Sequence, residues 1–94
     1  MLGINVIYEL KPGQRQDFLD CLEAAGIRAA VMAEPGCLKY DFYCSVDNPD
    51  ELLLVEKWTD REVQAIHLKQ PHMNGLRELK DRFVADSTVE LFDL

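Results

Sequence analysis

The sequence predicts an α+β domain whose strands and helices follow the order β-α-β-β-α-β. Three observations carry this prediction: stretches in which every second residue is apolar, stretches in which apolar residues recur every three or four positions, and Pro, Gly, Asp or Asn residues between them. This order is that of a split βαβ, or ferredoxin-like, domain with a four-stranded antiparallel sheet covered on one side by helices. The 94 residues contain no linker or repeat, so we expect a single domain, residues 1–94.

The first strand and the first helix are predicted from a change of period. Residues 2–10 alternate, and Lys11-Pro12-Gly13 ends that pattern. The face that we expect to be buried carries Leu2, Ile4, Val6, Tyr8 and Leu10. A helix over residues 14–33 follows, with one inward stripe at Phe18, Leu22, Ala25, Ala29 and Met32. Gly26 is a weak point in this helix because glycine costs about 1 kcal/mol relative to alanine.

The next two strands are predicted to form an antiparallel hairpin. Glu34-Pro35-Gly36 ends the helix, and residues 37–46 and 51–59 flank the turn Asp47-Asn48-Pro49-Asp50. On the first of these strands the core face is expected to hold Leu38, Tyr40, Phe42 and Cys44. On the second it is expected to hold Leu52, Leu54, Glu56 and Trp58. Glu56 and Trp58 are therefore neighbours on one face.

The last third of the chain returns to helices and closes with a strand. Asp60 is expected to cap a helix that runs to about Leu68, and Pro71 to begin another that runs to about residue 84. Residues 86–92 alternate and form the fourth strand. The third strand is apolar on both faces, so its outer face also needs a cover. With no further helix in the chain, we expect that cover to be a second copy, in a homodimer packed sheet to sheet.

Charge and composition limit the partners. The net charge of −7 and the scattered lysines and arginines argue against nucleic acid and against anionic membrane surfaces. No apolar run approaches the roughly 18 residues of a membrane span, and no signal peptide is visible, so a cytoplasmic location is expected. Cys21, Cys37 and Cys44 have no metal-binding or disulfide spacing and are interpreted as reduced, buried thiols.

The candidate chemical groups fall between residues 56 and 72. His67 and His72 are the only histidines, and an imidazole exchanges a proton near neutral pH. Glu56 occupies an otherwise apolar strand face, and a buried carboxylate requires a partner. If that partner is His67 or His72, the pair forms an oriented base; a structural salt bridge or exposure at the strand end is the alternative.

Other kinds of site have less support. His67 and His72 are five positions apart, with Pro71 between them, so they lack the shared helical face of a zincin motif, and no third ligand has a set spacing. No metal is therefore expected. The five glycines are isolated, so phosphate-cradling and dinucleotide loops are absent, and no serine stands in a nucleophile elbow.

Taken together, these motifs resemble the antibiotic-biosynthesis monooxygenase (ABM) family of small dimeric α+β barrel proteins. The resemblance covers nearly the whole chain and rests on four segments in order: Lys11-Pro12-Gly13, Glu34-Pro35-Gly36-Cys37-Leu38-x-Tyr40, Glu56-x-Trp58 and His67-x4-His72. It implies oxygenation of an electron-rich aromatic, such as a quinol or anthrone, without metal, flavin or haem. A base would deprotonate the substrate, and the resulting anion would reduce oxygen.

The resemblance also implies roles for individual residues. His67 or His72 would be the base and Glu56 its orienting partner, with Trp58 and Tyr40 as pocket walls. Asn5 would bind a substrate oxygen if the first strand borders the cavity.

Two alternatives to the oxygenase stay open. Some family monooxygenases carry an asparagine four residues before the tryptophan, where this chain has Leu54. The Glu-x-aromatic and His-x4-His pattern also resembles the family branch that isomerises the phosphorylated autoinducer-2 signal by keto-enol proton transfer. The lack of a basic cluster for a phosphate favours the oxygenase. A small-molecule-binding barrel without turnover is expected if both histidines point to solvent and no cavity lies beneath Trp58.

Overall fold

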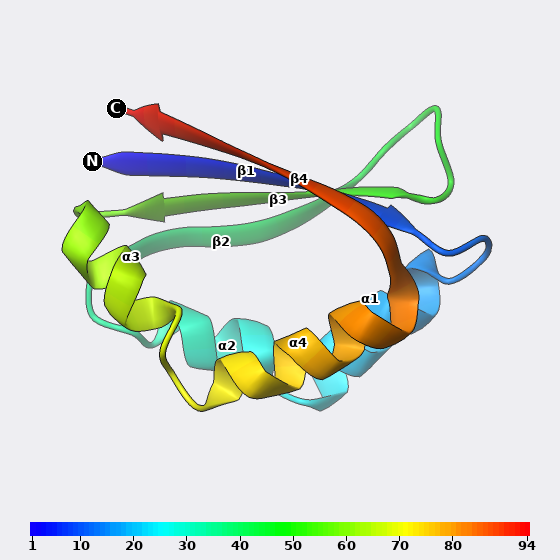
Figure 1. Ribbon diagram of the computed structural model, residues 1–94, viewed down its shortest axis with the longest axis horizontal. Helices are drawn as coiled ribbons and strands as arrows, with labels where there is room; N and C mark the ends of the chain where they lie inside the picture. Colours follow the sequence, from blue (N-terminus) through cyan, green and yellow to red (C-terminus); the bar gives the residue numbers. More distant parts are fainter.

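The computed structural model describes residues 1–94 and contains one antiparallel sheet of four strands. The strands are β1 (Leu2–Leu10), β2 (Cys37–Cys44), β3 (Glu51–Trp58) and β4 (Val84–Asp93), and they lie in the order β2-β3-β1-β4. All three pairings are antiparallel, and the two chain ends lie side by side at one end of the sheet (Figure 1). The predicted ferredoxin-like α+β fold is therefore confirmed.

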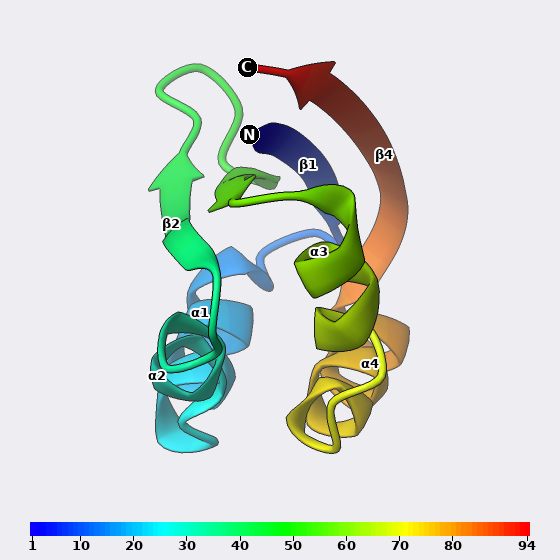
Figure 2. The same ribbon diagram turned by 90° about the vertical axis from the view of Figure 1, so that its left-hand side faces the viewer.

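Helices cover one face of this sheet. They are α1 (Arg15–Ala24), α2 (Ile27–Met32), α3 (Arg61–His67) and α4 (His72–Phe83). Seen end-on, α1 and α2 lie below β2, whereas α3 and α4 lie toward β1 and β4 (Figure 2). The core between the layers includes the alternate β1 residues expected from the sequence, namely Leu2, Ile4, Val6, Tyr8 and Leu10. None of the helices is long and apolar enough to cross a membrane.

The helix predicted over residues 14–33 is broken in two at Gly26. This glycine has φ +66°, a left-handed conformation that ends α1 and turns the chain into α2. The break rotates the second half of the predicted stripe, so that Ile27 and Val31 are buried while Met32 is exposed. The predicted inward positions Ala25, Ala29 and Met32 are exposed and were therefore wrong, because α1 ends at Ala24 and a single helical period does not continue through a left-handed residue.

Leu38 was predicted on the core face of its strand, but a β-bulge near the start of β2 turns it outward. Cys37 pairs with Trp58, and the register shifts before Lys39, so Leu38 is the extra residue and is 48% exposed. Cys37 packs against the core in its place. Tyr40 is buried as expected. Cys44, by contrast, is exposed, so the prediction that all three thiols are buried was wrong.

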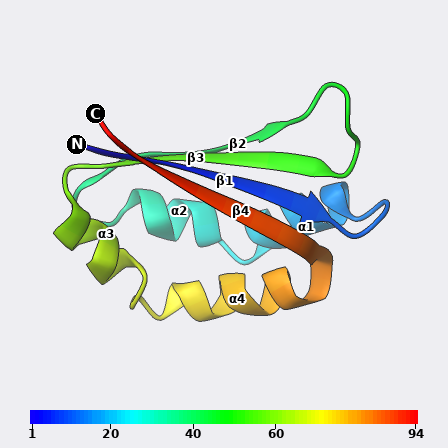
Figure 3. The same ribbon diagram turned by 45° about the horizontal axis from the view of Figure 1, so that its top comes forward.

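The segment after β3 places both histidines. The Asp60 carboxylate accepts a hydrogen bond from the Val63 N–H at 3.0 Å and caps α3, as predicted. His67 is the last residue of α3 and is turned inward, and His72 is the first residue of α4 after the break at Pro71. The two helices follow one another below the sheet in Figure 3.

The edge strand β4 is covered by no helix. All of its residues after Val84 are exposed, including the apolar Val89, Leu91 and Phe92. The register pairs Val89 with Val6 and Leu91 with Ile4, which places both on the helix side of the sheet. Phe92 pairs with Gly3 and belongs to the outer face.

Candidate functional site

A cavity of about 470 Å³ lies between the sheet and helices α3 and α4. Its lining combines an apolar body with a few polar groups. The apolar lining comes from Ile4, Val6, Leu54, Leu68, Met73, Leu76, Val89 and Leu91. The polar lining comes from Tyr8, Tyr40, Glu56, Arg61, Gln64, His67 and Lys80. This composition is typical of a small-molecule site.

A second hollow, of about 460 Å³, lies where α1 and α2 meet β2. It contains the Arg28–Asp41 ion pair and has no histidine in its lining. The cavity below β1 and β3 differs from this hollow because a histidine, a group suited to proton transfer, lines it.

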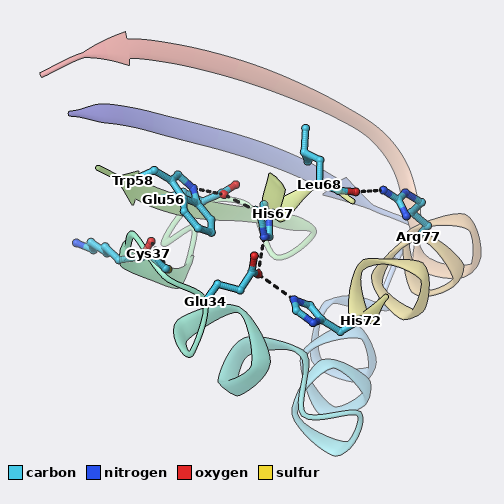
Figure 4. Close-up of polar contacts among 9 residues, drawn as sticks. Glu34, Cys37, Glu56, Trp58, His67, Leu68, His72 and Arg77 are labelled. Carbon is cyan, nitrogen blue, oxygen red and sulfur yellow. Dashed lines mark hydrogen bonds and ion pairs between the residues drawn. The ribbon is translucent and has the colours of Figure 1, made fainter. Parts of the chain in front are cut away.

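His67 is held by Glu34, a residue that the sequence did not single out. Its Nδ1 lies 2.7 Å from Glu34 Oε2, and His72 Nε2 lies 2.9 Å from the same oxygen (Figure 4). His67 is only 1% exposed, and the Glu34 side chain is 8% exposed. One buried carboxylate thus joins both histidines.

The Glu34 carboxylate determines which nitrogen of the His67 ring is free to accept a hydrogen bond. An ionised carboxylate only accepts hydrogen bonds, so His67 Nδ1 and His72 Nε2 both carry hydrogen when they donate to Glu34. In neutral His67 the remaining nitrogen, Nε2, is then unprotonated. Nε2 lies 4.0 Å from Glu56 Oε1. The result is an oriented imidazole with its basic nitrogen beside a second carboxyl group.

Glu56 is bound to Trp58. The indole N–H donates to Glu56 Oε1 at 3.0 Å, and the indole ring lies against the His67 ring with centroids 4.5 Å apart. Trp58 is fully buried behind the cavity and is absent from its lining. It therefore holds Glu56 and His67 in place from behind.

Burial changes the proton affinity of the cavity's acids. It raises the pKa of Glu56 above its ordinary value of 4.5, and the hydrogen bond from Trp58 and the nearby His67 act in the opposite direction. Burial, reinforced by the charge of Glu56, raises the pKa of Tyr8 and of Tyr40, so both phenols stay protonated at neutral pH. No buried polar side-chain atom lacks a partner, and neither hydroxyl bonds within the chain, so both hydroxyls reach the open cavity.

The structure brings some of the predicted site residues together and separates others. His67, Glu56 and Tyr40 line the cavity, with Trp58 directly behind them. His72 lies beyond Glu34 and is not in the lining.

Trp58, predicted as a pocket wall, lies behind the lining and is not part of it. Two further predicted placements need correction. Asn5 pairs with Val55, next to the inward pair Ile4 and Glu56, and alternation therefore turns it to the outer face of the sheet. Glu56 was predicted as the carboxylate that orients a histidine, but the hydrogen-bonded partner of both histidines is Glu34.

Sequence reasoning missed Glu34, Tyr8, Arg61 and Lys80 as site residues. Glu34 was assigned to the end of a helix and to a segment that carries the family resemblance, without a role in the site. Tyr8 was assigned to the core by its alternation. For Tyr8, a hydroxyl on a core-facing position was the available signal. Glu34 stands in a predicted turn, where no such signal exists. Arg61 and Lys80 lie on two separate helices, and no local spacing joins them.

The fold and the buried histidine define a small ferredoxin-like domain with an acid–base cavity. The sequence profile described as antibiotic biosynthesis monooxygenase matches residues 1–79, and the chain belongs to that family. It is 28% identical over 75 residues to "Putative monooxygenase YcnE" of Bacillus subtilis, a match that covers 80% of this chain and 77% of that protein.

Solved structures agree with this assignment. A protein described as an antibiotic biosynthesis monooxygenase is 27% identical with a TM-score of 0.87, and the match covers 100% of this chain and 98% of that one. A protein from Nitrosomonas europaea has the same fold, with a TM-score of 0.90 at 20% identity over 100% of this chain and 98% of that one.

Proposed function

We propose that the protein is a cofactor-independent monooxygenase that oxidises a small electron-rich aromatic of the quinol or anthrone type through a deprotonated substrate anion. The observation that carries this proposal is the buried His67 in the cavity lining, whose Nδ1 is bound by Glu34 and whose Nε2 lies 4.0 Å from the lining residue Glu56. In the proposed reaction this nitrogen is the general base that takes the substrate's proton.

The cavity lining supports an aromatic substrate. Its volume of about 470 Å³ is within the range of roughly 300–1,000 Å³ for small-molecule sites. Leu54, Met73 and Leu76 provide apolar contact for a flat ring. The hydroxyls of Tyr8 and Tyr40 are donors for a substrate oxygen that gains negative charge.

The reaction needs no reductant other than the substrate. His67 Nε2 takes a proton from the phenol or from the acidic C–H, and the anion transfers electrons to O2. One oxygen atom bonds to the substrate carbon, and the other leaves as water. For an anthrone-type CH2 group the balance is CH2 + O2 → C=O + H2O, with all four electrons supplied by the substrate. The imidazolium formed by His67 returns its proton to the departing oxygen.

Glu34 and Glu56 lie on opposite sides of the His67 ring and have different roles in this mechanism. Glu34 holds the imidazole orientation, and its charge stabilises the imidazolium. Glu56 lies beside Nε2 and is fixed by Trp58. The apolar lining keeps water away from the anion, which strengthens each of these interactions.

Oxygen uptake tests the function. Wild-type protein is expected to consume oxygen with a hydroquinone or anthrone substrate, and His67→Gln is expected to lose most of that rate. No uptake with either class, together with isomerisation of a phosphorylated sugar under nitrogen, would overturn the oxygenase.

One observation favours the isomerase as a second candidate. Arg61 and Lys80 both line the cavity, so a basic pair for a phosphate is present although the sequence showed no cluster. Keto-enol transfer would use the same His67. A binding domain without turnover is less well supported, because its expected features were solvent-facing histidines and no cavity.

We also propose a homodimer in which a second copy covers the outer face of the sheet. That face carries the half-buried Ile7, Leu53 and Val55 and the exposed Tyr43 and Phe92. Apolar side chains in this arrangement are typical of an interface between copies. Sedimentation at micromolar concentration is expected to give twice the mass of one chain, and a stable monomer would contradict the proposal.

A further inference from the structure

We propose that Glu34, His67 and His72 form a binding site for a divalent transition-metal ion, with Zn²⁺ as the best-suited probe. The sequence offered only the two histidines, and the fold adds the third ligand. The three residues come from separate parts of the chain: the turn after α2, the end of α3 and the start of α4.

The geometry of the three donor atoms supports a metal site. One carboxylate oxygen and one nitrogen from each imidazole all lie within 4.8 Å of one another. Both imidazoles point at the same oxygen, at 2.7 and 2.9 Å (Figure 4). Ligand bonds to Zn²⁺ are about 2.0–2.2 Å long, so ligand atoms in a tetrahedral site lie roughly 3.4 Å apart. Binding therefore requires the Glu34 oxygen to withdraw from both imidazole nitrogens, which lie 2.7 and 2.9 Å from it without an ion.

The donor types select the class of metal. Two imidazoles and one carboxylate form an established zinc ligand set, with a fourth position open to water. Imidazole nitrogen suits Zn²⁺, Cu²⁺ and Ni²⁺, whereas Mg²⁺ and Ca²⁺ prefer oxygen. The His72 side chain is 24% exposed, so an ion has a route from solvent that does not pass through the cavity.

The site lies behind the catalytic face of His67. Glu34 and His72 are absent from the cavity lining, and His67 alone belongs to both places. An ion on Nδ1 is therefore separated from the substrate by the imidazole ring. Neutral His67 with a metal on Nδ1 carries its hydrogen on Nε2, which becomes a donor. With the ion bound, Nε2 no longer accepts a proton, so we expect the ion to inhibit turnover. This expectation rests on the function proposed above.

Calorimetric titration of the chelator-treated protein with Zn²⁺ tests the site without substrate. One ion per chain is expected, and Mg²⁺ is expected to give no signal. Glu34→Gln and His72→Gln are each expected to weaken Zn²⁺ affinity at least about tenfold, because each removes a ligand. His72 is partly exposed, so its variant should keep the fold, which circular dichroism checks. Glu78→Gln and Cys44→Ser, at exposed positions outside the site, are matched controls that should bind as the wild type does.

Absorption of bound Co²⁺ gives an independent readout. Tetrahedral nitrogen and oxygen ligation is expected to produce visible bands in the wild type that disappear in His72→Gln. Absence of Zn²⁺ binding at 100-fold excess over protein, or affinity lost in Cys44→Ser and kept in Glu34→Gln, would overturn the site. Because these readouts involve no turnover, failure of the oxygenase assay leaves them unaffected. Zn²⁺ binding with undiminished turnover would overturn the inhibitory role alone.

Discussion

Replacing Glu34 by glutamine keeps the shape of the side chain that holds His67 and removes its charge. The carboxylate accepts from His67 Nδ1 at 2.7 Å in a nearly dry environment. When His67 takes a proton from the substrate, a charge pair forms at this range. Such a pair is worth about 4 kcal/mol at 4 Å and an effective dielectric constant of about 20. The neutral amide retains part of this interaction, so we expect a loss of about 2–3 kcal/mol, or about 30- to 150-fold in kcat.

The assay is oxygen uptake at saturating substrate, with Glu78→Gln as the matched control at an exposed position. KM should change little because Glu34 does not line the cavity. A kcat within twofold of wild type for Glu34→Gln would refute the reasoning, since the orienting charge would then have no role. A rise in KM at unchanged kcat would place Glu34 in substrate binding instead.

Three further predictions follow from burial, strand direction and backbone conformation. Because burial raises the pKa of Glu56, the contribution of this group to the free energy of unfolding is largest below its ordinary pKa of 4.5 and is lost as pH rises through the folded-state pKa. Glu56→Gln should therefore gain stability relative to wild type between pH 4 and pH 8, and urea denaturation that shows a pH-independent difference would contradict this. Asn5→Ala should keep kcat/KM within about twofold of the wild-type value, because Asn5 faces away from the cavity. A large loss of kcat/KM in the same oxygen assay would show that Asn5 belongs to the site. Gly26→Ala should cost about 1–2 kcal/mol in thermal or urea unfolding from its left-handed φ of +66° alone, since a Cβ there meets no atom within 4 Å; an unchanged midpoint would contradict that strain.

The fold was predictable because its signals are local. Alternation along β1 and β3 depends on neighbouring residues, and the Pro and Gly breaks mark the ends of elements. The bulge at Leu38 depends on how β2 pairs with β3, a long-range property that alternation within β2 cannot reveal. The break at Gly26 was visible as a weak point, but the direction of α2 depends on its packing.

The site was predictable only in part, because its central contact joins distant residues. Glu34 lies 33 residues from His67 and 38 from His72, so no spacing rule links them. The turn at Gly36 brings them together: its φ is +85°, and a Cβ there would lie 2.8 Å from the Thr59 hydroxyl and 2.9 Å from Val63. Glycine thus lets the segment after Glu34 approach the start of α3. This steric requirement becomes visible only once the chain is folded.

The tautomer of His67 is the most direct test of the central claim, that Glu34 holds an unprotonated Nε2 toward the cavity. Long-range ¹⁵N–¹H NMR correlation of the imidazole rings, on chelator-treated wild-type protein near pH 7.5, distinguishes the two neutral forms. We predict that neutral His67 carries its hydrogen on Nδ1 and that Glu34→Gln weakens this preference. A His67 with its hydrogen on Nε2 in the metal-free wild type would contradict the account, because the nitrogen that faces the cavity would then be a donor and not a base.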